Sequence, residues 1–209
     1  MMYPVARATL ITLMLAAPAY AADAPAPPAK PDAAKTDAGE TRLAMLPADS
    51  ITHHTITVHG QKLAYAATAG TMKMRDDKGE PTAALFYVAY TLNGAPQANR
   101  PVSFFFNGGP GAGSAYLHLG AAGPKVLNFP AQETDGAHAT LIDNDNTWLA
   151  FTDMVFIDPV GTGYSLAAKP EDAPKLFWGA HQDAETLAKT IALWLTRNGR
   201  TASPKFVVG

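Results

Sequence analysis

The chain has no cysteine among its 209 residues. This absence excludes disulfide bonds, thiol catalysis and zinc sites built on cysteine. The chain also lacks a marked excess of either charge, because 16 basic residues face 18 acidic residues and the formal net charge is -2. No run of lysine and arginine marks a surface for nucleic acid or for an anionic membrane. What remains is a chain with 47% hydrophobic residues, long enough for one domain with a sizeable core.

The N-terminal apolar stretch, residues 8–17, is too short for a permanent membrane anchor. It follows Arg7 and precedes a small-x-small cleavage site at residues 19–21. We therefore expect residues 1–21 to be a secretory signal peptide, with a retained anchor as the alternative. An exported chain without cysteine suggests a bacterial envelope, so we expect a periplasmic or secreted protein.

Residues 22–49 are rich in alanine and proline and contain few large apolar side chains. Such a composition cannot offset the entropy of ordering, so the sequence predicts a disordered tether. Residues 50–209 are expected to form the folded domain. After Ser50, apolar and polar residues alternate, a turn follows at 59–61, and an apolar run covers 84–92. This pattern predicts antiparallel strands joined by short connections.

After Pro101 the pattern changes to strands that are apolar on both faces. These runs are VSFFFN from Val102, DMVFID from Asp153 and KFVVG from Lys205. Apolar residues at helical spacing over 181–199 predict a helix between the last two runs. Strands that are apolar on both faces are typical of a parallel sheet covered by helices. The sequence therefore predicts an α/β fold, with an antiparallel hairpin that enters a mostly parallel sheet.

Residues 104–114 read FFFNGGPGAGS, an apolar strand that leads into a loop of glycine and proline. Gly108 to Ser114 match a phosphate-binding loop in outline, but the lysine before the hydroxyl residue is missing and Pro110 removes a backbone donor. A dinucleotide fingerprint fails because the glycine spacing is wrong. A tight turn is one remaining interpretation. The other is an oxyanion hole, where side chains would obstruct the approach of a substrate oxygen to backbone N–H groups.

Four motifs resemble those of the serine carboxypeptidases, peptidase family S10 of the α/β-hydrolase fold. FFFNGGPGAGS resembles the signature W-x-N-G-G-P-G-x-x-S, and 123–124 stands where the family has a Gly-Pro. Residues 144–148 (NDNTW) resemble N-x-x-S-W, and residues 159–165 (PVGTGYS) resemble P-x-G-x-G-F-S. The resemblance covers about residues 50–209. Prolyl iminopeptidases carry a His-Gly-Gly-Pro-Gly loop instead, and Asn107 before the glycines favours the carboxypeptidases.

The resemblance implies roles for three residues of the glycine loop. Gly109 matches the glycine whose backbone N–H forms half of the oxyanion hole. Asn107 matches the asparagine whose amide helps to hold the terminal carboxylate of the substrate, and Gly108 matches a glycine whose N–H assists. A neutral amide can donate to a carboxylate without a titration of its own. A turn-capping amide is the alternative for Asn107.

In the family, the strand P-K-F-x-x-x-G continues as the nucleophile elbow G-E-S-Y-x-G, whereas this sequence ends at Gly209. We therefore expect the catalytic Ser, Asp and His to lie beyond Gly209, and this portion alone to be inactive. Ser114 and Ser165 are interpreted as loop-stabilising hydroxyls, and Trp148 as core packing. Ala121 stands where many members have a glutamate, which leaves the preference for acidic pH open.

The histidines show no ligand-like spacing, so we expect neither a metal nor another cofactor; they are His53, His54, His59, His118, His138 and His181. The resemblance implies a serine carboxypeptidase that acts on peptide or protein substrates. From the charge pattern we expect no nucleic-acid partner, and from the signal peptide no stable membrane insertion after cleavage. Two alternatives stay open: an α/β-hydrolase of another specificity, such as an aminopeptidase or esterase, and a truncated chain without catalysis.

Overall fold

The computed structural model describes residues 38–96, 98–108, 111–130 and 136–209. The expected signal peptide lies outside these residues and stays a prediction, as does the first part of the expected tether. Ordered structure begins before Ser50, however, because helix α1 spans Ala38–Leu43. Leu43 is 3% exposed and packs in a small apolar cluster with Ala84 and Ala168. The predicted boundary at Ser50 is corrected accordingly, since burial of this leucine stabilises the helix that carries it.

Three long strands form the antiparallel part of the sheet: β1 (Ser50–Val58), β2 (Gln61–Arg75) and β3 (Pro81–Leu92). The predicted turn between β1 and β2 is confirmed. His59 and Gly60 both have positive φ, at 47° and 82°, as a two-residue hairpin turn requires.

The three apolar runs form strands β4 (Val102–Phe105), β7 (Asp153–Ile157) and β9 (Lys205–Val208). The strand order β1-β2-β3-β7-β4-β9 places β4 between β7 and β9, parallel to both, while β3 runs antiparallel to β7. The short strand β8 (Leu166–Ala167) also pairs with β3. The predicted α/β fold is confirmed. The antiparallel part of the described sheet is larger than the sequence suggests, because β2 and β3 are 15 and 12 residues long.

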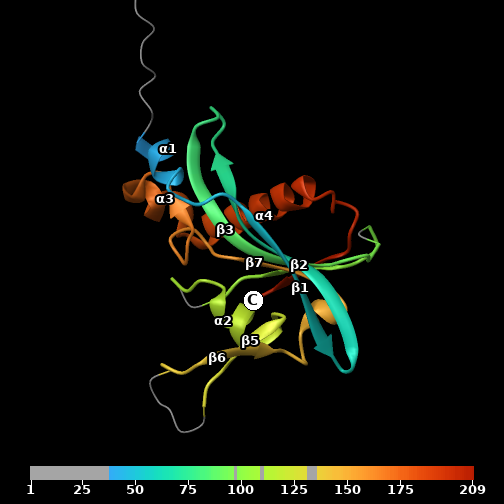
Figure 1. Ribbon diagram of the computed structural model, residues 1–209. Helices are drawn as coiled ribbons and strands as arrows, with labels where there is room; N and C mark the ends of the chain where they lie inside the picture. Colours follow the sequence, from blue (N-terminus) through green and yellow to red (C-terminus); the bar gives the residue numbers. More distant parts are fainter. Residues whose placement is uncertain (1–37, 97, 109–110, 131–135) are drawn as a thin grey trace, which may run out of the picture. The chain divides into compact units, whose positions relative to one another are not determined.

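The predicted helix is α4 (Ala180–Arg197), and it ends where Gly199 adopts a φ of 65°. Trp194 and Leu195 bury its inner face in the cluster that contains Phe104 of β4. The rings of Trp194 and Phe104 meet edge to face at 5.7 Å. In Figure 1, α4 lies on one side of the sheet and α2 with β5 and β6 on the other.

The remaining described elements are short. They are α2 (Ala115–Leu117), the π-helical turn η1 (His118–Ala122), β5 (Lys125–Asn128), β6 (Thr140–Asp143), η2 (Trp148–Ala150), η3 (Pro170–Asp172) and α3 (Ala173–Phe177). Strands β5 and β6 form a separate two-stranded sheet.

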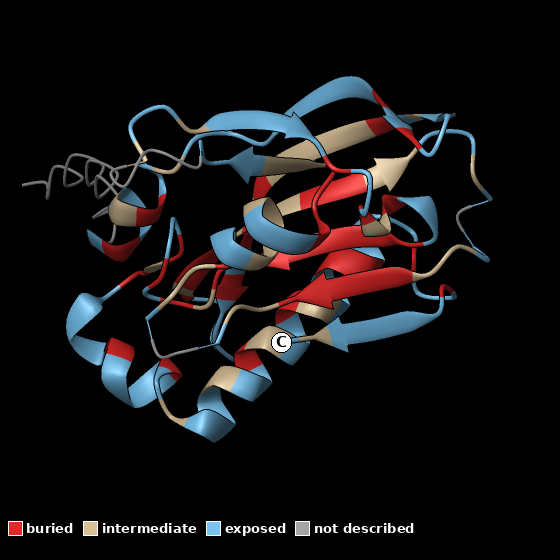
Figure 2. Cartoon of the chain, turned by 90° about the horizontal axis from the view of Figure 1, so that it is seen from below, coloured by how far each residue is buried: buried red, intermediate tan, exposed pale blue. Residues whose placement is uncertain are grey.

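Two apolar clusters cover the two faces of the central strands. Successive residues of β4 point to opposite faces, so Phe104 packs with α4 while Phe105 packs with Phe156 on the other face. Figure 2 shows that the central strands are buried and the outer strands largely exposed. The predicted burial of these strands on both faces is confirmed for β4 and β7.

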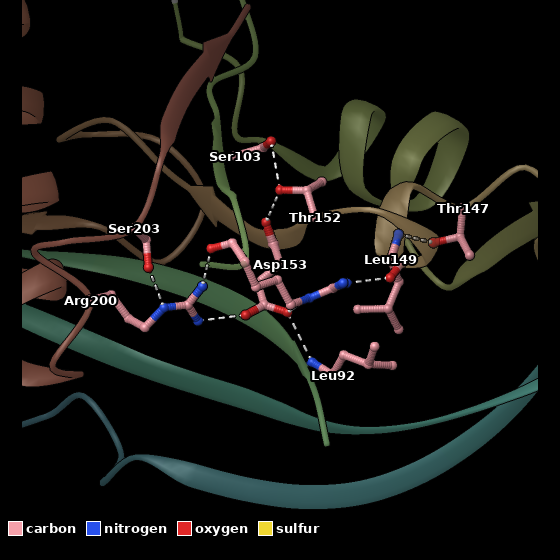
Figure 3. Close-up of polar contacts among 9 residues, drawn as sticks. Leu92, Ser103, Thr147, Leu149, Thr152, Asp153, Arg200 and Ser203 are labelled. Atoms are coloured by element: carbon pink, nitrogen blue, oxygen red, sulfur yellow. Dashed lines mark hydrogen bonds and ion pairs between the residues drawn. The ribbon is translucent and has the colours of Figure 1, made fainter. Parts of the chain in front are cut away.

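A buried ion-pair network fixes the amino ends of the parallel strands (Figure 3). Asp153, the first residue of β7, is 1% exposed and accepts from Arg100 at 2.7 Å and from Arg200 at 2.5 Å. Arg200 also donates to Ser203 Oγ and to the carbonyl oxygen of Arg100. Because Arg100 precedes β4 and Arg200 precedes β9, the network fixes the starts of three strands relative to one another. Among the described helices, none is long and apolar enough to span a membrane.

Candidate active site

The glycine loop leaves the carboxyl end of β4, where loops of an open α/β sheet form ligand sites. Asn107 is partly exposed, and its Nδ2 donates to the carbonyl oxygen of Gly108 at 3.1 Å. In the part of the chain that is described, no other hydrogen bond of the Asn107 amide is found. Gly109 lies outside the described residues, so its role in an oxyanion hole stays a prediction. Gly111 has a φ of 93°, a backbone conformation that favours glycine.

The second signature loop, residues 159–165, leaves the neighbouring strand β7 at the same edge of the sheet. Its Ser165 hydroxyl donates to the carbonyl oxygen of Asp158 at 2.6 Å and accepts from the Phe86 N–H at 2.8 Å. The hydroxyl of Ser114, at the end of the glycine loop, donates to the carbonyl oxygen of Ile157. Both serines are buried, so the interpretation of their hydroxyls as loop-stabilising is confirmed.

Asp158 joins the two loops and was missed in the sequence analysis. Its carboxylate accepts the N–H of Ser114 at 2.7 Å and the N–H of Tyr164 at 3.4 Å. Burial raises the pKa of Asp158, and these two hydrogen bonds act in the opposite direction. The available signal was its position: a carboxylate directly after a fully buried parallel strand, between two glycine-rich loops.

A cleft of about 670 Å³ opens between the two loops and the start of α4. Asn107 and Gly108 line one side, Val160 and Gly161 line another, and Trp178 and Asp183 line the helix side. The Trp178 indole N–H donates to the carbonyl oxygen of Val160 at 3.2 Å, so the ring is held against the second loop. The structure thus brings two of the three predicted site residues, Asn107 and Gly108, to the wall of one mostly apolar cleft.

Asp183 is the titratable residue that lines this cleft. It lies in the first turn of α4, where a carboxylate is favoured by the helix dipole. Desolvation raises its pKa. A second cleft of about 690 Å³, between α1, β2 and the end of α4, contains none of the signature residues.

Residues 144–148, the third motif, hold the segment that follows the glycine loop. The amide of Asn144 donates to the carbonyl oxygens of Ala121 and Gly123, at 2.7 and 2.8 Å. Gly123 is needed there because a Cβ would overlap the carbonyl oxygen of His118. Trp148 packs edge to face with Phe105, which confirms its interpretation as core packing.

His118 is a partly buried titratable group in the turn that follows the glycine loop. It contacts the Tyr90 hydroxyl through Nε2 at 2.5 Å and stacks on Phe156 at 4.7 Å. Burial lowers the pKa of His118 to about 4 and raises the pKa of Tyr90. The imidazole is therefore neutral near pH 7. Within the described residues, no group of three or more His, Asp or Glu side chains could hold a metal ion.

Comparison with known proteins supports this arrangement of motifs. The chain is 36% identical over 81 residues to the "Pheromone-processing carboxypeptidase KEX1" of Debaryomyces hansenii, covering 38% of this chain and 11% of that protein. It is 32% identical over 123 residues to the protein of the same name from Cryptococcus gattii, covering 57% of this chain and 18% of that protein. The aligned parts thus span less than a fifth of these relatives. The family model of the serine carboxypeptidases, peptidase family S10, matches residues 60–209. By this match the chain belongs to the serine carboxypeptidase family.

Proposed function

We propose that the protein is an exported serine carboxypeptidase that releases C-terminal residues from peptide or protein substrates through an acyl-enzyme. The observation that carries the proposal is the Asn107 amide at the carboxyl end of β4, on the wall of the cleft and beside the backbone of Gly108. The names of the aligned relatives, which are carboxypeptidases, support the same reaction class.

In this proposal, Asn107 and Gly108 bind the terminal carboxylate of the substrate. The Asn107 Nδ2 has two N–H bonds. One donates to the carbonyl oxygen of Gly108, so the other is available to an anion. Gly109 supplies one oxyanion donor through its backbone N–H. The catalytic serine attacks the scissile carbonyl carbon, a histidine takes the serine proton, and the released amine receives that proton. Water then hydrolyses the acyl-enzyme.

The experiment compares two peptides of one sequence, with a free and an amidated C-terminus, on the full-length protein. Wild type should cleave the free peptide much faster. Asn107→Ala should lower kcat/KM for the free peptide about tenfold or more, because a hydrogen bond to a charged group is worth roughly 1.5–3 kcal/mol. The amidated peptide should be affected far less.

The matched control is Asn99→Ala. Asn99 is exposed and lies before β4, at the opposite end of the strand. This variant should keep the wild-type ratio between the two peptides. If wild type already cleaves both peptides equally, the carboxypeptidase proposal fails and a hydrolase of broader specificity replaces it.

A further inference from the structure

Asp158 is held by backbone donors from two different loops. Oδ1 accepts the N–H of Ser114 at the end of the glycine loop, and Oδ2 accepts the N–H of Tyr164 in the second loop. The side chain itself follows β7, whose residues are all buried. One carboxylate therefore connects the glycine loop, the second loop and the central sheet.

The two loops also close around this carboxylate without space for side chains. A Cβ at Gly113 would lie 3.0 Å from Asp158 Oδ1, and a Cβ at Gly163 would overlap Oδ2. Gly163 has a φ of 47°, so the second loop adopts a left-handed conformation at the point of closest approach. Glycine at these two positions is what lets the backbone N–H groups reach the carboxylate.

Burying the Asp158 carboxylate lowers the free energy of unfolding, which is unexpected for a residue that only stabilises the fold. Asp158 is 9% exposed, and no lysine or arginine pairs with it in the described part of the chain. An unpaired buried carboxylate loses its hydration, and its two backbone hydrogen bonds offset only part of that loss. Buried titratable groups without a counter-charge are frequent at functional sites.

We infer that Asp158 is a positioning residue that fixes the glycine loop for the reaction. This inference rests on the proposed function. The glycine loop is fixed at its start by β4 and at its end by the Ser114 N–H, so the donors of Asn107 and Gly108 lie between two anchored points. A displacement of about 1 Å in such donors costs on the order of a hundredfold in rate.

The first test replaces Asp158 by asparagine in the full-length protein, which keeps the size but supplies one acceptor oxygen instead of two. We expect kcat to fall at least about tenfold at a temperature well below unfolding, because the donors of Asn107 and Gly108 no longer hold the substrate in the reactive position. Hydrogen exchange of residues 106–117 should become faster. The matched control is Ser103→Ala. Ser103 lies on β4, and its buried hydroxyl contacts Thr152 and neither of the two loops. It should lower Tm and leave kcat and loop exchange unchanged.

A second pair of variants acts on the loop side of the hydrogen bond. Ser114 has a φ of -72°, which proline tolerates. Ser114→Pro removes the N–H donor, and its ring Cδ takes the place of the hydrogen and displaces the Asp158 carboxylate. Ser114→Ala removes the hydroxyl and keeps the donor. Ser114→Pro should lose kcat as Asp158→Asn does, and Ser114→Ala, which loses only the loop-stabilising hydroxyl, should lose less. The double variant of Asp158→Asn with Ser114→Pro should be no worse than either single variant.

The inference is overturned if Asp158→Asn or Ser114→Pro keeps both kcat and slow loop exchange. It is overturned as well if faster exchange leaves kcat unchanged. If wild type hydrolyses no peptide, the proposed function fails separately. The exchange rates then decide alone whether Asp158 holds the loop, and unchanged rates reject it.

Discussion

Asp153 binds two arginines at the start of β7, and both come from segments far away in the sequence. Arg200 is 1% exposed and Asp153 equally so, which makes this a buried charge network with one carboxylate and two guanidinium groups. No local pattern in the sequence could have predicted it, because Arg100 and Arg200 are 100 residues apart and only the sheet brings them together. Asp158 differs, because its position after a buried strand was a signal, although its donor Ser114 lies 44 residues away.

The first prediction concerns Asp153→Asn. Loss of the carboxylate leaves the Arg200 cation buried without a counter-charge, so the free energy of unfolding should fall by roughly 3–5 kcal/mol. Chemical denaturation measures it. Asp143→Asn is the control, because Asp143 pairs with Lys125 at an exposed position and should change stability by less than about 1 kcal/mol. Equal losses in the two variants would contradict the account of the network.

His118 should make the fold sensitive to acid. Its pKa is about 4 in the folded state, against 6.5 for the unperturbed group, so the unfolded chain binds the proton first as the pH falls. Its neutral form therefore stabilises the fold fully above about pH 6.5, and this contribution is lost as the pH falls toward 4.

The second prediction is that wild type loses about 3 kcal/mol more stability than His118→Gln between pH 7 and pH 4. Glutamine keeps a partner for the Tyr90 hydroxyl but does not titrate. Denaturant unfolding at both pH values gives the difference. His53→Gln, at an exposed position of β1, should behave as wild type. A parallel pH dependence of wild type and His118→Gln would reject this role.

At the scale of elements, the sequence predicted the strands and the helix that follow a long pattern of apolar residues. The apolar runs of β4, β7 and β9 and the periodicity of α4 were sufficient, because a buried parallel strand and an amphipathic helix each require a recognisable order of residues. The hairpin of β5 and β6 was not predicted, since its strands have four residues each and are largely exposed. Helix α1 was missed because its six residues are fixed by Leu43 packing on the sheet rather than by their own composition.

The candidate site was predicted in part for the same reason. Asn107 and Gly108 stand in a dense local motif, and the structure places both on the cleft. Trp178 and Asp183 belong to no such motif. They reach the cleft only because α4 begins against the second loop, and that contact depends on the packing of the whole helix.

The third prediction tests the second loop as an element. Gly163→Ala introduces a Cβ that overlaps Asp158 and requires a left-handed backbone. Gly199 also has a positive φ, 65° against 47° at Gly163, but a Cβ at Gly199 meets no atom within 4 Å. Both should lose about 1–2 kcal/mol to backbone strain, and Gly163→Ala should lose about 1–3 kcal/mol more from overpacking. Thermal or denaturant unfolding separates the two losses. Equal losses would mean that the loop yields freely around Asp158.

At the scale of the whole molecule, the proposed export can be checked independently of catalysis. The fourth prediction is that the exported protein starts at Ala22, after a signal peptide of residues 1–21. Intact-mass analysis of the protein recovered from the cell envelope or medium decides this. An exported protein that retains Met1 would contradict signal cleavage.

The proposed function requires that this member of the serine carboxypeptidase family shortens peptides from the C-terminus. A time course of one unblocked peptide with the full-length protein, read by mass spectrometry, tests this requirement. We expect a ladder in which the C-terminal residues leave one at a time while the N-terminal residue stays in every product. Products that lose N-terminal residues, or that arise by a single internal cut, would contradict it.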